Sequence, residues 1–270
     1  MSGEGAAAAA RDLLIVVDVG NTNTVVGAFD LDNGRAGKLR GHWRLETRAR
    51  RTSDEYAATL HELFTLAGLP WQIEGGMVAT VVPPALFAVE KLFEEHLKTR
   101  PLVVGPGLKT GMPILYDNPR EVGADRVVNA VAAFARFRRG LIVVDFGTAT
   151  TFDAVSPRGE YLGGAIAPGV SISMEALFRN ASKLPRVEFA RPPHVVGKNT
   201  VASMQSGLVY GYVGLVDGIC ERMQAELSFP ALVVATGGLA PLVAGLSKAI
   251  VEVDEHLTLD GLRIIHEMNA

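Results

Sequence analysis

The sequence predicts an α/β protein made of two duplicated lobes, each with a mixed β-sheet, and three observations lead to that prediction. The segment "LIVVDVGNTNTVVGA" at residues 14–28 and the segment "LIVVDFGTATTFDAV" at 141–155 share one pattern: an apolar run, Asp-x-Gly, a polar turn with threonine and a second apolar run. Asp145 follows Asp18 by 127 residues, close to half of the 270-residue chain, and the same offset matches Gly20 with Gly147 and Thr24 with Thr151. Both hairpins are followed by alternating strand and helix patterns. This spacing is typical of a duplicated domain rather than of a short repeat.

In the first half, the elements after the hairpin mix an antiparallel strand with strand–helix alternation. The helix expected at 53–67 has Ser53 as a candidate N-cap and Gly68 directly after its end. The other elements expected here are a strand at 39–46, a strand at 77–82, a helix at 84–98, a short strand at 101–104 and a helix at 123–138.

The second half has a similar mixture of elements, which predicts a second mixed sheet. Its expected elements are a strand near 160–167, helices near 171–180 and 200–226, a strand at 231–236, a helix at 239–246, a strand at 249–253 and a helix at 258–268. We therefore expect an N-terminal lobe at 13–139 and a C-terminal lobe at 140–270, connected by the helix at 123–138. A cleft between two such lobes is a favoured ligand site.

Composition and charge narrow the class of protein. The chain is 48% hydrophobic and 20% charged, with a net charge of −3 and no Lys/Arg-rich run, so nothing indicates a nucleic-acid partner. Cys220 is the only cysteine, which excludes an intramolecular disulfide and fits a cytoplasmic protein. Residues 1–12 lack the apolar core of a signal peptide and are expected to form a disordered tail. Prolines and glycines interrupt the uncharged stretch 227–247, which therefore predicts a strand, a turn and a helix start instead of a membrane span.

The polar turns of the two hairpins indicate phosphate binding. Turns with glycine let backbone N–H groups approach phosphate oxygens, and threonine and asparagine add donors. Asp18 ends the first apolar strand, and a carboxylate beside phosphates requires a cation such as the Mg²⁺ of a metal–nucleotide complex. The Thr-Gly-Gly at 236–238 is a candidate surface for a base or ribose, and a tight turn between a strand and a helix would have the same sequence pattern. The chain contains neither GxxxxGK[ST] nor GxGxxG, so P-loop and Rossmann sites are not supported.

A candidate catalytic pair lies in "YDNPREVGADRVVNAVAAF" at residues 116–134. Gly123 precedes Asp125 and Arg126 at the start of the predicted helix, where free N–H groups and the positive end of the helix dipole lie. Asp125 is a candidate base for an acceptor hydroxyl, and Arg126 is a candidate anchor for a substrate carboxylate. A second interpretation stays open, in which Asp125 is only an acid favoured by the helix dipole and paired with its neighbouring arginine.

Taken together, these motifs resemble the type III pantothenate kinase family. The segments that carry the resemblance follow the family's order across about residues 13–260: "DVGNTNTVVGAFD", "YDNPREVGADR", "DFGTATTFD", "GGAIAPGV", "LPRV", "GKNTVASMQSG" and "ATGGLA". The resemblance implies the fold of the sugar kinase, heat-shock ATPase and actin superfamily, with an ATP cleft between two ribonuclease H-like lobes. It implies ATP-dependent phosphorylation of the primary hydroxyl of pantothenate, the first step of coenzyme A biosynthesis. A non-catalytic nucleotide-binding regulator on the same fold and a kinase of another small hydroxy acid remain as alternatives.

The resemblance also implies roles for particular residues. Asp125 would accept the proton, Asp145 would bind a monovalent cation, either K⁺ or NH₄⁺, and Asp18 would contact the Mg²⁺ of ATP directly or through water. The residues expected to bind ATP are Asp18, Val19, Gly20, Asn21, Thr22, Asn23, Thr24, Val25 and Thr148. The residues expected to bind pantothenate are Tyr116, Gly123, Ala124, Asp125, Arg126 and Thr200.

A homodimer with the acceptor site near the subunit interface is a further implication of the resemblance. The predicted helix at 200–226 contains "SGLVYGYVGLVDG", which is rich in small and apolar residues. Such a surface belongs either to the core or to a dimer face. We favour the dimer face, because Gly207, Gly211 and Gly214 would permit close packing, beside Tyr210 and Tyr212.

Overall fold

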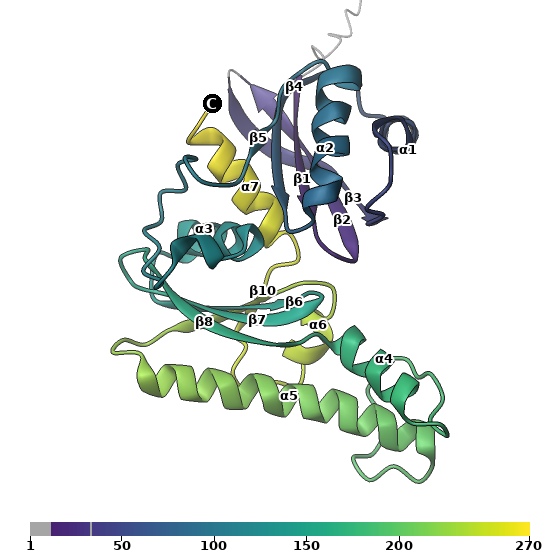
Figure 1. Ribbon diagram of the computed structural model, residues 1–270. Helices are drawn as coiled ribbons and strands as arrows, with labels where there is room; N and C mark the ends of the chain where they lie inside the picture. Colours follow the sequence, from purple (N-terminus) through teal and green to yellow (C-terminus); the bar gives the residue numbers. More distant parts are fainter. Residues whose placement is uncertain (1–11, 33) are drawn as a thin grey trace, which may run out of the picture. The chain divides into compact units, whose positions relative to one another are not determined.

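The computed structural model describes residues 12–32 and 34–270, so the tail expected at 1–12 lies outside the described residues except for Asp12. The chain forms two compact units. The first unit contains the chain up to Lys109 together with Leu262–Ala270, and the second unit spans Thr110–Gly261. Each unit contains one five-stranded sheet (Figure 1).

The sheet of the first unit has the strand order β3-β2-β1-β4-β5. β1 pairs antiparallel with β2 and parallel with β4, so the sheet is mixed. Its strands are β1 (Asp12–Val19), β2 (Asn23–Asp32), β3 (Arg35–Glu46), β4 (Ile73–Thr80) and β5 (Leu102–Val103).

Helices α1 (Ser53–Leu66) and α2 (Pro83–Lys91) cover one face of this sheet. Side chains alternate between the two faces of a strand, and the odd-numbered residues of β1 pack into a core with α1, α2 and the π-helical turn η1 (Leu92–His96). On the opposite face, His266 of α7 (Leu257–Glu267) lies against Gly75 of β4, at the place where a side chain would project. The sheet is thus packed on both faces.

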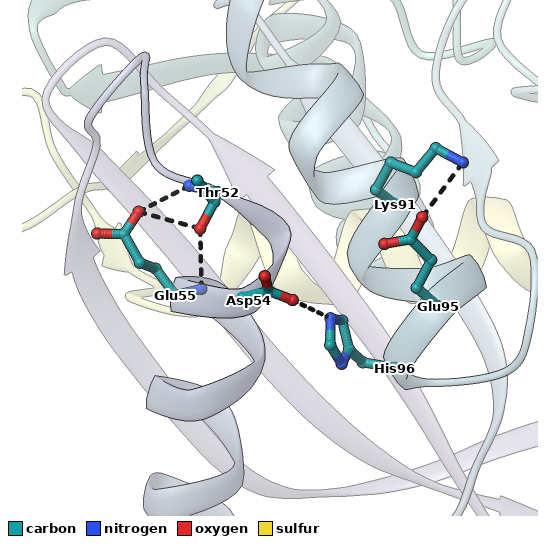
Figure 2. Close-up of polar contacts among 6 residues, drawn as sticks. All are labelled: Thr52, Asp54, Glu55, Lys91, Glu95 and His96. Carbon is teal, nitrogen blue, oxygen red and sulfur yellow. Dashed lines mark hydrogen bonds and ion pairs between the residues drawn. The ribbon is translucent and has the colours of Figure 1, made fainter.

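Local hydrogen bonds fix the start of α1 (Figure 2). The Thr52 hydroxyl accepts a 3.2 Å hydrogen bond from the backbone N–H of Glu55, and the Glu55 carboxylate accepts a 2.8 Å bond from the backbone N–H of Thr52. This capping box satisfies two donors that a helix start leaves without partners. Asp54 also contacts His96 at 2.9 Å, which ties α1 to η1. The helix therefore begins with Thr52 as its N-cap, one residue before the N-cap expected from the sequence.

The sheet of the second unit has the order β10-β9-β6-β7-β8. β6 pairs antiparallel with β7 and parallel with β9, which is the arrangement of β1 with β2 and β4. The two sheets therefore share one topology, and the internal duplication predicted from the hairpins is confirmed. The strands are β6 (Leu141–Phe146), β7 (Ala149–Val155), β8 (Tyr161–Pro168), β9 (Leu232–Thr236) and β10 (Glu252–Val253).

Within the second unit, α3 (Ala124–Phe137) and α5 (Thr200–Glu226) lie on opposite faces of the sheet (Figure 1). α3 packs on β6 and β7, whereas Val216 and Cys220 of α5 join the core on the other face. Burial raises the pKa of the Cys220 thiol to about 12, in keeping with its place in this core. The remaining helices are η2 (Pro119–Glu121), α4 (Val170–Asn180) and α6 (Ala240–Ala244).

The α/β class and the two mixed sheets agree with the prediction, and most predicted elements lie within a few residues of their observed limits. β3 starts earlier than expected, at Arg35, and the helix predicted at 84–98 is divided into α2 and η1. The limits of the units differ from the predicted lobes, because α3 packs on β6 and β7 and so belongs to the second unit. Among the helices of the described residues, none is long and apolar enough to cross a membrane.

Candidate active site

The β1–β2 turn places the first group of predicted nucleotide-binding residues together in the first unit. Asp18 is partly buried and lies opposite Val25 in the ladder. The turn is closed by a 3.0 Å hydrogen bond from the Gly20 N–H to the Asn23 carbonyl oxygen. Asn21 and Thr22 are exposed at the tip, whereas Val19 and Thr24 are fully buried. The residues at the tip are thus available to a ligand, and the buried ones form the base of the turn.

The β6–β7 turn is one residue shorter than its counterpart. Only Gly147 and Thr148 separate the two strands. Thr148 is partly buried, and its carbonyl oxygen would lie 2.0 Å from a Cβ atom placed on Gly169. Only glycine at 169 lets the end of β8 approach the turn this closely. The turn is therefore packed tightly against the segment that leads into α4.

The ladders show which threonines correspond in the two hairpins. Thr24 lies opposite Val19, and Thr150 lies opposite Phe146 at the matching place in the second hairpin. The sequence comparison matched Thr24 with Thr151 instead, and that match is wrong by one residue because the second turn is shorter. Thr150, like Thr24, is fully buried.

The start of α3 orients the carboxylate of Asp125. Asp125 is partly buried, and its Oδ1 atom accepts a 2.8 Å hydrogen bond from the backbone N–H of Arg126. A Cβ atom on Gly123 would lie only 2.6 Å from that same oxygen. The backbone φ of Gly123 is −58°, which does not itself require glycine. The reason for glycine at this position is therefore the space that the Asp125 carboxylate occupies.

Arg126 is buried and paired with Asp153, a carboxylate of β7 that the sequence analysis did not select. The Nε and Nη2 atoms of Arg126 each lie 2.7 Å from Asp153 Oδ1. The Tyr161 hydroxyl donates to the same oxygen at 2.6 Å, and the Thr151 hydroxyl donates to Oδ2 at 3.1 Å. Burial raises the pKa of Asp153, while Arg126 and the two hydroxyls act in the opposite direction. Tyr116 packs edge-on against Tyr161, with ring centroids 6.4 Å apart.

Asp145 lies on the α3 side of β6, and its pKa is raised above the ordinary value for a carboxylate. Its Oδ2 atom accepts a 3.0 Å hydrogen bond from the Asn129 amide, whose oxygen accepts one of 2.7 Å from Thr258. Burial, followed by the nearby carboxylates of Asp125 and Asp153, raises the pKa of Asp145 to about 7. The structure thus brings three carboxylates into one electrostatic group in the second unit.

Two oxygen atoms of β6 lie close to the backbone of Gly237. Gly237 has a φ of +93°, and a Cβ atom on it would lie 2.7 Å from the Phe146 carbonyl oxygen and 2.9 Å from Asp145 Oδ1. Any side chain at 237 would fill the space in front of these two oxygens. Carboxylate and carbonyl oxygens are donors suited to hard cations. Within the described residues, no group of three or more His, Cys, Asp and Glu side chains is arranged to hold a metal ion.

Thr200 occupies a different part of the second unit. It is exposed at the start of α5 and lines a pocket of about 750 Å³, together with Leu177 of α4, Leu184 and Lys198 of the segment between the two helices, and further residues of α5. Neither Asp125 nor Arg126 lines this pocket. Of the residues predicted to bind pantothenate, the structure therefore groups Tyr116 and residues 123–126 around α3 and β8, and it leaves Thr200 with α5.

Sequence reasoning missed Asp153, Asn129 and Tyr161. The signal for Asp153 was strand alternation, because Asp145 and Asp153 lie on the same face of the hairpin as Thr151. The signal for Asn129 was helical spacing, since residue 129 follows Asp125 by one turn of α3. Tyr161 carried no local signal, because its position depends on the pairing of β8 with β7.

Comparison with solved structures supports the predicted fold. The chain resembles an inorganic polyphosphate/ATP-glucomannokinase from Arthrobacter sp. strain KM, with 15% identity and a TM-score of 0.51 over 96% of this chain and 100% of that one. At this identity the likeness concerns the fold alone, and it agrees with the α/β fold that the family resemblance implies.

Comparison of sequences identifies the family. A family model described as type III pantothenate kinase matches residues 14–222. A type III pantothenate kinase of Anaeromyxobacter sp. (strain Fw109-5) is 67% identical over 258 residues, which cover 95% of this chain and 100% of that protein. Another, of Myxococcus xanthus (strain DK1622), is 66% identical over 95% of this chain and 99% of its own. The chain belongs to the type III pantothenate kinase family.

Proposed function

We propose that the protein transfers the γ-phosphoryl group of ATP to the primary hydroxyl of pantothenate and forms 4′-phosphopantothenate and ADP, the first step of coenzyme A synthesis. The observation that supports this best is the oriented Asp125 carboxylate at the start of α3, beside the ion-paired Arg126, within a chain of this family. Phosphoryl transfer depends mainly on positioning and electrostatic stabilisation.

In this proposal Asp125 is the catalytic base. The acceptor oxygen bonds to phosphorus as the bond to ADP breaks, and Asp125 takes the proton that the hydroxyl releases. A carboxylate can do this late in the reaction if it is held close to the hydroxyl. The hydrogen bond from Arg126 N–H and the space left by Gly123 hold it in one orientation.

The nucleotide and its cations are assigned to the two Asp-x-Gly turns. We propose that Asp18 to Val25 and Thr148 contact ATP, with Asp18 toward its Mg²⁺. Asp145 and the Phe146 carbonyl would hold the monovalent cation, whose charge would offset that of nearby carboxylates and phosphates. The features that support this are the exposed turn tip at 21–22 and the close approach of Asp145 Oδ1 and the Phe146 carbonyl oxygen to Gly237.

The acceptor is assigned to Tyr116, residues 123–126 and Thr200. A guanidinium has five N–H donors, and Asp153 lies against the Nε and Nη2 side of Arg126. A two-pronged contact between a pantothenate carboxylate and that side would have to displace Asp153. We therefore propose that Arg126 uses its Nη1 side for the acceptor.

We also propose a homodimer acting in the cytoplasm. On α5, the positions that a Cβ would take on Gly207, Gly211 and Gly214 have no described atom within 4 Å, apart from the helix's own backbone. Tyr212 instead points inward, where its hydroxyl contacts Ser173 at 2.6 Å and the Pro168 carbonyl oxygen at 2.9 Å. The glycine face is thus a surface on which a second copy can pack closely. Sedimentation across a dilution series tests this, and a monomer at micromolar concentration contradicts it.

The function itself is tested by an ATP-consumption assay with pantothenate in K⁺ and in Na⁺ buffer, with mass spectrometry of the product. We expect a phosphorylated product and faster turnover in K⁺. Asp125→Asn should lower kcat by about 10²- to 10⁴-fold while ATP still binds. Turnover independent of K⁺ would overturn the cation site, and unchanged activity of the variant would overturn the base. ATP binding without any product would favour a regulator or another acceptor.

A further inference from the structure

Asp153 is a carboxylate that the proposed reaction does not use, and its side chain is fully buried. Removing a carboxylate from water costs several kcal/mol unless charged and hydrogen-bonding partners surround it. The contacts of Asp153 should therefore show why a carboxylate is buried at this position.

These contacts converge on Arg126. The Nε and Nη2 atoms of the guanidinium each lie 2.7 Å from Asp153 Oδ1. The same oxygen accepts a 2.6 Å hydrogen bond from the Tyr161 hydroxyl. The centre of the guanidinium also lies 5.8 Å from the centroid of the Tyr161 ring. With 8% of its side chain exposed, Arg126 is held from several sides in one rotamer.

The fixed guanidinium also fixes the main chain of the neighbouring catalytic residue. The backbone N–H of Arg126 is the donor to Asp125 Oδ1, so the two side chains share the first turn of α3. Since Asp153 lies in the middle of β7, the ion pair joins that turn to the sheet. Displacements of about 1 Å at a reacting group can lower the rate by about 100-fold.

The sheet of the first unit shows that the fold does not need this carboxylate. The ladder places Asp153 opposite Val143, and the matching position in the first hairpin, opposite Val16, is Gly27. That sheet has the same strand order without an acid at this position. A buried ion pair is by itself weak support for stability, so a purely structural role explains Asp153 poorly.

We propose that Asp153 is a positioning residue: it holds the Arg126 guanidinium and the first turn of α3 in the orientation required to bind and deprotonate the acceptor. Tyr161 and Thr151 complete the hydrogen bonds of its two oxygens. This inference rests on the proposed function and names the residue on which acceptor binding depends.

The test is the steady-state kinetics of Asp153→Asn in the full-length protein. We expect the KM for pantothenate to rise about 10- to 100-fold and kcat to fall, with the KM for ATP within about twofold of the parent value. Asp30→Asn is the matched control, because Asp30 is a buried carboxylate of β2 that pairs with Arg40 at 2.8 Å in the other unit. It should leave both KM values unchanged. An unchanged pantothenate KM in Asp153→Asn overturns the inference.

A double-mutant cycle separates positioning from loss of structure. In an Arg126→Gln background, Asp153→Asn should change the pantothenate KM by no more than about twofold, because the residue through which it acts is already gone. An equally large effect in both backgrounds contradicts the proposal. If Asp153→Asn does not fold, Tyr161→Phe removes one contact to the same oxygen and should shift the pantothenate KM in the same direction.

A readout independent of turnover tests the contact itself. The Arg126 Nε–H proton, assigned with Arg126→Lys, should be protected from exchange in NMR spectra of the parent protein and lose that protection in Asp153→Asn. If the parent protein fails to phosphorylate pantothenate, the proposed function fails, and this measurement still decides whether Asp153 holds Arg126. Equal exchange in parent and variant overturns the inference.

Discussion

The two Asp-x-Gly turns have nearly the same sequence and occupy the same place in two sheets of equal topology, yet they are built differently. In the first hairpin Asp18 lies opposite Val25, and in the second Asp145 lies opposite Thr151, because the β6–β7 turn is one residue shorter. The first turn presents an exposed polar tip, whereas the second is packed against Gly169 and has Asp145 in a group of three carboxylates. The two hairpins thus have the same strand pairing, and the difference in turn length determines which side chains are exposed or buried at each turn.

The buried threonines show the same divergence in detail. The Thr24 hydroxyl lies 2.8 Å from the Thr47 hydroxyl, directly after β3. At the corresponding place after β8 the chain has Gly169, which has no side chain. Accordingly, the Thr150 hydroxyl is buried without a hydrogen-bond partner among the described residues. The shorter turn needs the glycine, and the glycine removes the partner of Thr150.

The largest effect is expected for Gly169→Ala. Its Cβ would lie 2.0 Å from the Thr148 carbonyl oxygen and 2.7 Å from that of Gly147, both backbone atoms that cannot move aside alone. We expect a loss of about 3 kcal/mol or more in the free energy of unfolding, measured by urea titration. Thr47→Ala at the corresponding place in the first unit should cost about 1 kcal/mol. Equal costs at the two positions would contradict the proposed difference between the turns.

Asp145→Asn is expected to stabilise the protein at alkaline pH while lowering activity. Since the pKa of Asp145 is raised to about 7, the stability that comes from its protonated form is present at low pH and is lost as pH rises from about 4 to 7. The amide removes this penalty, so the variant should gain about 1–3 kcal/mol at pH 8 and much less near pH 4. Thermal unfolding at both pH values in K⁺-free buffer measures it. A difference independent of pH would contradict the raised pKa.

Thr24→Val tests the buried pair in the first hairpin. Valine keeps the shape of threonine but leaves the Thr47 hydroxyl without this contact. We expect the free energy of unfolding to fall by about 1–2 kcal/mol. The double variant with Thr47→Val should recover part of that loss, because both polar groups are then replaced. Full additivity of the two substitutions would argue against a direct bond.

The smallest effect, with the opposite sign, is expected for Thr150→Val. This change removes a buried hydroxyl that has no partner among the described residues, so stability should rise by about 1 kcal/mol or stay unchanged. Urea titration beside Thr24→Val gives the comparison directly. A loss as large as that of Thr24→Val would mean that the Thr150 hydroxyl has a partner, such as a bound water.

Much of this molecule could be predicted from its sequence, because local patterns determine it. The repeated apolar–Asp-x-Gly pattern predicts both hairpins, and the order of elements predicts two mixed sheets. The start of α3 at the Gly-Ala-Asp-Arg segment also follows from local signals. The proposed roles of the turn residues and of Asp125 remain predictions that the assay above tests.

The remainder depends on contacts between distant segments. The partner of Arg126 was not predictable from its own helix, since Asp153 lies 27 positions later on β7 and Tyr161 is supplied by β8. The threonine match failed because a one-residue difference in turn length shifts the register, which residue spacing alone does not reveal. The sequence placed the limit between the lobes at 139/140, with a connecting helix at 123–138. The units instead divide after Lys109 and after Gly261, since α3 packs on β6 and β7 and residues 262–270 bond to the first unit.

The division of the chain into units determines which unit can finish folding first during synthesis. Leu262–Ala270 belongs to the first unit, where the Asn269 side chain bonds the backbone of Lys109 at 3.0 and 2.8 Å and Glu267 accepts a 3.1 Å bond from the Ala36 N–H. On the ribosome, the unit that is begun first therefore lacks one of its segments until Leu262–Ala270 has been synthesised, whereas the contiguous second unit is complete earlier. Residues 262–270 thus set the moment at which the first unit can finish folding.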